Sequence, residues 1–167
     1  MKRLGLSDAS CIEVTPGATM LTDNYVVAPP SMWNLRSKDA RRVMEFSKKH
    51  PTVGVIIRWY HDEKACRPSR LLGFLREFDA FDYADVEMLG KAEVPGGSYG
   101  KRRFYRIHSG NGTTYLNADW ADVFLARGCS PAVYKPLKAV QWQDEKGQRV
   151  GYQMPAILPE KLKGDAR

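Results

Sequence analysis

The sequence lacks clustered cysteines and any zinc-type spacing of cysteine and histidine. Its 167 residues include three cysteines, Cys11, Cys66 and Cys129, which are odd in number and far apart. This pattern predicts reduced thiols rather than disulfides, as is typical of a cytoplasmic protein. Cys11 and Cys129 lie in apolar surroundings, so we expect both in the core.

Long apolar runs are missing as well. No stretch approaches the ~20 apolar residues of a transmembrane helix, and no strongly amphipathic basic helix has a broad apolar face. The first eight residues begin with Met1, Lys2 and Arg3 but contain no apolar run, so no signal peptide is expected. We therefore expect a cytoplasmic location and no membrane partner.

Catalytic motifs are equally scarce. The chain has no HExxH motif, no P-loop and no dinucleotide-type glycine fingerprint. His61, Asp62 and Glu63 stand near Cys66, which could place a base beside acids and a thiol, although a polar loop is the favoured interpretation. The sequence thus predicts a protein that is not an enzyme, with no cofactor and no bound metal.

What the sequence does have is segregated charge. Five carboxylates and no Lys or Arg fall within eleven residues, here called the acidic window: Glu77, Asp79, Asp82, Asp85 and Glu87. The whole chain carries +7, and outside the window 26 basic side chains face 14 acidic ones, leaving +12. Because like charges repel until something neutralises them, this surplus predicts a polyanionic partner, with nucleic acid favoured over a membrane surface.

The acidic window itself allows three interpretations. Asp79, Asp82 and Asp85 recur every third residue and could hold Mg²⁺ in a nuclease. A solvated acidic face is favoured over that, and contact with a basic surface of another copy is the third possibility. With the Pro-Gly-Gly stretch at 95–97, the region near 77–100 is predicted to be a long acidic connection.

Periodicity and turn residues predict an α+β fold of antiparallel sheets with two main helices on one side. We expect a single domain over 1–158 and a charged tail over 159–167. One helix is predicted at 37–50, and a second begins at the capping residue Asn117 and ends at Gly128. Residues 61–70 are predicted to be a polar loop, and 71–78 a short helix or turn. The predicted strands are 11–15, 18–21, 25–28, 52–60, 102–108, 113–116, 132–134, 139–142 and 149–154, with turns at 111–112 and 144–147.

Two basic clusters are candidate contacts for nucleic acid. The first lies off the apolar stripe of the helix predicted at 37–50. The second leads into the strand predicted at 102–108, where Phe104 and Tyr105 are interleaved with the cations, a combination that suits backbone charge plus base stacking. An edge strand protected by charge is the equally favoured alternative. The candidate residues are Arg41, Arg42, Lys48 and Lys49 in the first cluster, and Lys101, Arg102, Arg103 and Arg106 in the second.

The run YLNADWADVFLARG (115–128), with GYQMPAIL (151–158), resembles the closing segment of DNA sliding clamps and their phage-encoded relatives. MLTDNYVVAP (20–29) is similar to a hairpin of the same family. The resemblance implies a clamp-like fold whose helices face duplex DNA without reading its sequence. It therefore places the first basic cluster on DNA and adds Lys38 to that cluster. It also implies that Met154 and Pro155 line a partner-binding cleft. The second helix, with Asp119 and Asp122, fits a DNA-facing role poorly, and a ring would need several copies of this short chain.

Three functions remain open from the sequence. The favoured one is a non-catalytic DNA-associated or accessory protein, a phage-type clamp-like module that binds duplex DNA non-specifically as a monomer or homo-oligomer. The second is a small phage-type inhibitor or adaptor that binds a host protein such as a nucleic-acid enzyme, with the four tryptophans as anchors. The third is a metal-dependent nuclease that uses the acidic window.

Overall fold

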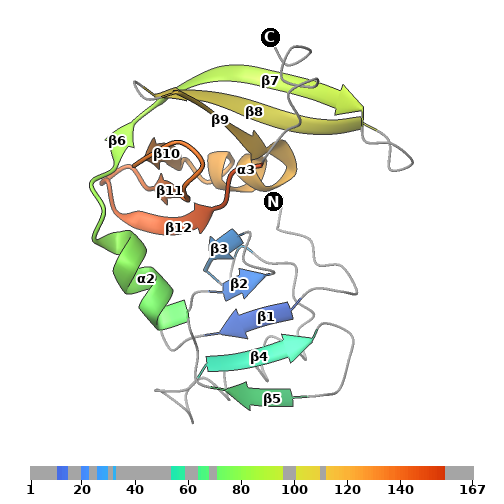
Figure 1. The fold of residues 1–167 in the computed structure, drawn as a ribbon, viewed down its shortest axis with the longest axis vertical. Coiled ribbons are helices and arrows are strands. Elements are labelled where there is room, and N and C mark those ends of the chain that lie inside the picture. Colours follow the sequence, from blue (N-terminus) through green and yellow to red (C-terminus); the bar gives the residue numbers. More distant parts are fainter. Residues whose placement is uncertain are drawn as a thin grey trace. The chain divides into compact units, whose positions relative to one another are not determined.

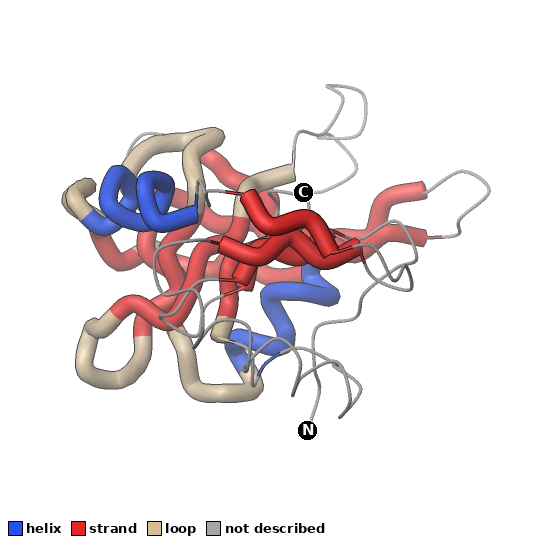
Figure 2. Tube along the Cα trace, turned by 90° about the horizontal axis from the view of Figure 1, so that it is seen from below, coloured by secondary structure: helices blue, strands red, loops and turns tan. Residues whose placement is uncertain are grey.

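The computed structural model describes residues 11–14, 20–22, 26–29, 32, 54–58, 64–67, 71–95, 101–109 and 112–156. Strands dominate these residues and two helices accompany them, so the predicted α+β class is confirmed (Figure 2). The chain divides into two compact units, Arg3–Phe81 and Asp82–Arg167. The division falls inside the acidic window, and the charged tail at 159–167 lies outside the described residues.

The first unit contains five short strands in the order β5-β4-β1-β2-β3, and the adjacent strands are antiparallel. The strands predicted near 11–15, 18–21, 25–28 and 52–60 are confirmed, with somewhat different ends. The helix predicted at 37–50 lies outside the described residues. The strands are β1 (Cys11–Val14), β2 (Met20–Thr22), β3 (Val26–Ala28), β4 (Gly54–Arg58) and β5 (Lys64–Arg67).

Two segments of the first unit bear on the sequence predictions. The polar loop predicted at 61–70 is wrong over Lys64–Arg67, because these residues form β5 and pair with β4 through Val55 and Cys66. Pairing with a neighbouring strand here outweighs the polar composition on which the prediction relied. The segment after it, predicted as a helix or turn, is the helix α2 (Leu71–Asp79), in which Leu75 is buried.

The long acidic connection is wrong over much of its length. Residues after Tyr83 form β6 (Ala84–Asp85) and then the nine-residue strand β7 (Glu87–Pro95). The register of β7 shifts between Met88 and Lys91, and Gly90 there adopts a φ of 106°. A bulge of this kind breaks the alternation of side chains by which a strand is recognised in sequence, so the strand was missed.

The second unit holds two antiparallel sheets, β7-β8-β9 and β12-β11-β10-β6, and the helix α3 (Figure 1). The predicted strands of this part are confirmed. Since β8 is the central strand of its sheet, the interpretation of residues 102–108 as an edge strand is wrong. The elements after β7 are β8 (Lys101–Ser109), β9 (Gly112–Asn117), α3 (Ala118–Leu125), β10 (Ser130–Val133), β11 (Val140–Gln143) and β12 (Arg149–Gln153).

The helix α3 begins where its sequence predicts and ends at Leu125, three residues before the predicted Gly128. The side chain of Asn117 accepts a hydrogen bond from the backbone N–H of Asp119 at 2.9 Å, which caps the first turn. After the helix, Gly128 takes a φ of 75°, a left-handed conformation that glycine adopts without a steric penalty. Neither helix in the described residues is long and apolar enough to cross a membrane.

The core of the second unit lies where α3 meets β11. The buried ring of Phe124 stacks on that of Trp142, with centroids 5.0 Å apart and planes within 1°. The indole N–H of Trp142 donates to Gln153 Oε1, and the amide of Gln153 donates to the backbone oxygen of Asn117. The polar atoms of these buried side chains are thus paired, as burial requires. Cys129 is also buried, as predicted, and its thiol is free.

Candidate nucleic-acid interface

Successive residues of β8 point to opposite faces of the β7-β8-β9 sheet. Tyr105 and Arg103 contact α3, so their face is called the inner face. Because side chains alternate along a strand, Arg102, Phe104, Arg106 and His108 occupy the opposite, outer face. The burial of β9 agrees with this assignment: Thr114 and Leu116 are buried, whereas Thr113 is exposed and Tyr115 half-buried. The second basic cluster is therefore divided between two surfaces.

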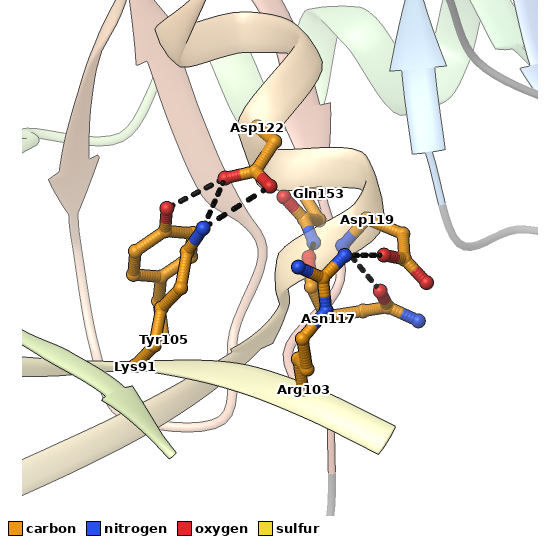
Figure 3. Close-up of polar contacts among 7 residues, drawn as sticks. All are labelled: Lys91, Arg103, Tyr105, Asn117, Asp119, Asp122 and Gln153. Carbon is orange, nitrogen blue, oxygen red and sulfur yellow. Dashed lines mark hydrogen bonds and ion pairs between the residues drawn. The ribbon is translucent and has the colours of Figure 1, made fainter. Parts of the chain in front are cut away.

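On the inner face, a carboxylate of α3 is held by two side chains of the sheet (Figure 3). The hydroxyl of Tyr105 donates to Asp122 Oδ1 at 2.5 Å. The ammonium of Lys91 lies 3.2 Å from Oδ1 and 3.3 Å from Oδ2 of Asp122, and 5.0 Å from the centroid of the Tyr105 ring. This arrangement fastens the helix to β7 and β8 by a charge-assisted cluster.

The same cluster shifts two pKa values. Burial, reinforced by the hydrogen bond to Asp122, raises the pKa of Tyr105 above its ordinary value of 10.0. The proximity of Tyr105 and then of Asp122 raises the pKa of Lys91 above 10.5. Both groups therefore keep their protons at neutral pH, and neither is prepared to act as a general base there.

A second ion pair joins the inner face to α3. Arg103 Nη2 lies 2.7 Å from Asp119 Oδ1, with the Arg103 side chain partly exposed and the Asp119 side chain largely exposed. The two carboxylates of α3, three residues apart on one side of the helix, are thus each matched by a cation from the sheet. Because Arg103 is engaged in this way, its charge is matched by Asp119 within the second unit.

The outer face has a different character. Arg102 and His108 are exposed, Arg106 is half-buried, and neither Arg102 nor His108 forms an ion pair within the described residues. Phe104 is only 5% exposed because Tyr115 and Ala156 pack against it. The one acidic side chain that the register places there, among those described, is Glu87, opposite His108. The Arg102 end of this face is therefore positively charged.

The remaining predicted site residues fall into three groups. The first basic cluster (Lys38, Arg41, Arg42, Lys48 and Lys49) lies outside the described residues, and for Lys101 only the backbone position in β8 is described. Met154 and Pro155 are half-buried and follow β12 directly. The next residue, Ala156, donates its backbone N–H to the oxygen of Tyr115 at 2.8 Å. The structure thus brings the predicted partner-binding segment beside the outer face.

The acidic window is not gathered into one site. Its five carboxylates are all exposed and are distributed over α2, the following turn, β6 and the start of β7. Across the described parts of the chain, no three His, Cys, Asp or Glu side chains lie together as a metal ion would require. The nuclease hypothesis gains no support from these positions, and incubation of plasmid DNA with Mg²⁺ tests it.

Sequence reasoning missed the cluster of Lys91, Tyr105 and Asp122. Lys91 was assigned to a connection, and Asp122 was noted only as a poor match to a DNA-facing helix. The spacing of the residues did contain a signal. Arg103 and Tyr105 lie on the same face of the predicted strand, and the two carboxylates of the following helix, Asp119 and Asp122, lie on the same side of that helix, so each strand residue can pair with one carboxylate. Such a match predicts a strand and a helix packed through polar pairs.

Comparisons with protein-family models, with curated proteins and with solved structures find no match to this chain. The distribution of charge over the second unit is therefore the basis of the proposals that follow. Its main feature is that the carboxylates of α3 are matched on the inner face, while the outer face keeps cations of its own.

Proposed function

We propose that the protein is a non-catalytic, DNA-associated accessory protein that contacts phosphate groups through basic surfaces. The observation that carries this proposal is the division of β8 into two faces. Arg103 and Lys91 are engaged by the carboxylates of α3, whereas the exposed Arg102 forms no ion pair within the described residues. A chain of net charge +7 that still has exposed cations of this kind attracts polyanions.

The physical mechanism is electrostatic. Arginine presents planar N–H donors that match phosphate oxygens, and each phosphate it neutralises releases counterions from the nucleic acid. Contacts of this type position a protein on DNA but do not read bases, so binding is expected to be independent of sequence.

The experiment is to measure duplex DNA affinity as a function of salt concentration. We expect log K to fall linearly with log salt, by a slope of about −0.9 for each phosphate contacted. Catalysis is checked in the same preparation by incubating the DNA with Mg²⁺ and looking for cleavage. An affinity that does not change between low and high salt contradicts the electrostatic mechanism, and cleaved DNA contradicts the non-catalytic part.

The finer part of the proposal is a clamp-like arrangement around duplex DNA. It assigns the DNA-facing role to the first basic cluster, from Lys38 to Lys49, as the resemblance implies. α3 is assigned no such role here, because Asp119 and Asp122 make it acidic and engage the sheet. Mass measurement in solution, with and without DNA, tests this part. An assembly of several copies supports a ring, and a strict monomer in both conditions contradicts it.

A second candidate function is binding to a host protein as an inhibitor or adaptor. The observation in its favour is Leu137, which is 60% exposed and adopts a φ of 60° in the turn between β10 and β11. The turn holds this apolar side chain out between the exposed Lys135 and Lys138. Trp142, in contrast, is buried and offers no anchor. Recovery of a stoichiometric protein after nuclease treatment, lost in Leu137→Ser, would favour this function over the first.

A further inference from the structure

Building on the proposed DNA association, we infer that the turn between β10 and β11 is a wedge that inserts Leu137 between neighbouring base pairs of duplex DNA. In this arrangement Lys135 and Lys138 contact the phosphates on either side of the inserted side chain. Such a wedge rests on the proposed function and adds to it a contact that opens the base stack without reading the bases.

The conformation and the exposure of Leu137 are not accounted for by the fold. Its φ of 60° is left-handed, and among the described residues it is the one non-glycine residue with a positive φ. This conformation costs free energy for leucine, whereas glycine and asparagine adopt it readily. The side chain is 60% exposed, so burial recovers little of that cost. An apolar side chain held out in an unfavourable conformation indicates a use outside the protein.

The turn is held in place by its own backbone and by the neighbouring hairpin. The backbone N–H of Lys138 donates to the oxygen of Lys135 at 3.3 Å, which closes the turn around Leu137. Pro136 lies against Gly112 at the start of β9, since its Cγ would be 3.5 Å from a Cβ at that glycine. The proline ring also fixes φ at its own position. Because the tip is ordered before DNA binds, its insertion loses less entropy.

Two lysines flank the apolar tip. Lys135 and Lys138 are exposed, and neither forms an ion pair within the part of the chain that the structure describes. The ammonium of Lys135 lies 5.1 Å from the centroid of the Tyr134 ring. Tyr83 packs on the same ring, with centroids 6.4 Å apart, and thereby brings the preceding carboxylate, Asp82, near the base of the turn. A polyanion is therefore expected to approach from the side of Lys138.

One apolar tip between two cations suits duplex DNA better than an apolar protein pocket. Phosphates lie on both sides of a DNA groove, so each lysine can neutralise one while the tip enters the groove. Proteins that bend DNA insert side chains such as leucine between base steps in this way, partly unstacking them. In an apolar pocket, by contrast, the two ammonium groups would be withdrawn from water without a partner. The net charge of +7 also favours the anionic occupant.

The test compares two labelled duplexes of equal length, one fully paired and one with a single central mismatch, by fluorescence anisotropy with the full-length chain. A wedge gains from the mismatch, because the base stack there costs less to open. We expect the wild-type chain to bind the mismatched duplex about fivefold more tightly. Leu137→Asn removes the apolar tip but tolerates the left-handed backbone. It should abolish this preference and weaken binding to the paired duplex by at most about threefold.

Matched variants separate the tip from its charges. Leu89→Asn changes the other large apolar side chain that is exposed among the described residues, at 41%, and should leave the preference unchanged. Lys138→Glu should weaken binding to both duplexes alike, by about tenfold, because both carry the same phosphates. Lys146→Glu makes the same charge change in the turn at 144–147 and should weaken each by less than about threefold.

The outcomes separate the wedge from the proposed function. If the wild-type chain binds both duplexes equally, or if Leu137→Asn and Leu89→Asn reduce the preference alike, there is no wedge and DNA association stands. If Leu137→Asn changes neither affinity, the wedge is likewise excluded, and Leu137 is left to the protein-binding function. Failure of the wild-type chain to bind either duplex overturns both proposals.

Thermal unfolding checks the premise about the backbone. The midpoint of Leu137→Asn should not fall below that of the wild type, because asparagine tolerates the left-handed conformation at this position. A clear fall would show that Leu137 serves the fold itself, which would remove the reason to assign it a role outside the protein. The same measurement on the other variants shows that their folds are retained in the comparison.

Discussion

The two faces of the β7-β8-β9 sheet carry similar residues with different roles. Each face receives arginine and tyrosine, but the inner face meets the carboxylates of α3 and the outer face meets none from that helix. Tyr105 and Arg103 consequently make polar contacts with α3 inside the unit, whereas Arg102 is exposed and makes no ion pair within the described residues. Neighbouring residues of one basic run can therefore have different roles. Side chains alternate between the two faces of a strand, so one arginine contacts the helix while the next is exposed.

The largest effect is expected from Phe104→Ala, which tests whether the outer face contributes to the core. Phe104 is 5% exposed and packs with Tyr115 and Ala156. Its truncation removes apolar contacts and leaves a cavity, so we expect a loss of about 3 kcal/mol in the free energy of unfolding. Urea denaturation measures this loss. A change below about 1 kcal/mol would mean that Phe104 is not a structural part of the outer face.

Asp122→Ala breaks the contacts of the inner face. It leaves the partly buried hydroxyl of Tyr105 without its acceptor and Lys91 without its counter-charge. We expect the free energy of unfolding to fall by about 2 kcal/mol, because the Tyr105 hydroxyl is then withdrawn from water without a hydrogen-bond acceptor. Asp119→Ala is the matched control on the same helix. Its side chain is 67% exposed, so the loss there should not exceed about 1 kcal/mol. Equal losses in the two variants would show that the contacts of Asp122 stabilise the protein no more than the exposed ion pair of Asp119.

Tyr105→Phe isolates one hydrogen bond of the inner face and its pH dependence. At neutral pH we expect a loss of about 1 kcal/mol. The pKa of Tyr105 is raised in the folded state, so its contribution is fully present below the ordinary tyrosine pKa of 10.0 and is lost as pH rises through the raised value. The difference in stability between wild type and variant should therefore shrink above about pH 10. A difference that stays constant to pH 11 would contradict the assigned contact.

The smallest effect on stability is expected from Arg102→Ala on the outer face. Arg102 is exposed and forms no ion pair in the described residues, so the change should lie within about 0.5 kcal/mol. The matched variant is Arg103→Ala, which removes the ion pair with Asp119. It should lower the free energy of unfolding by up to about 1 kcal/mol, and this loss should be smaller in high salt. Thermal unfolding at two salt concentrations measures both. A larger, salt-independent loss in Arg102→Ala would assign that residue to the packing instead.

Local signals made much of the second unit predictable. Gly112 at the hairpin, the cap at Asn117, and Gly128 after the helix each impose a backbone conformation that few other residues favour. The turn at 144–147 is of the same kind, since Asp144 Oδ1 accepts hydrogen bonds from the backbone of Lys146 and Gln148. Elements bounded by such residues were placed nearly correctly from sequence.

The rest depended on contacts that sequence does not display. Lys91 and Asp122 are 31 positions apart, and they meet only because β7 pairs with β8 in one register. The bulge before Lys91 reverses the alternation within β7, so the face on which Lys91 lies could not be read from the pattern. The strand β5 was missed for a similar reason. Its residues have little strand propensity of their own and form a strand because they pair with β4.

The irregularity at Gly90 also has a consequence for self-association. β7 is an edge strand of its three-stranded sheet. A straight edge strand would offer its unpaired backbone N–H and C=O groups to a strand of a second molecule. The φ of 106° and the shifted register interrupt the row of donors and acceptors near the middle of the strand. Copies of this chain should therefore resist joining sheet to sheet through β7, and any oligomer would be built from other surfaces.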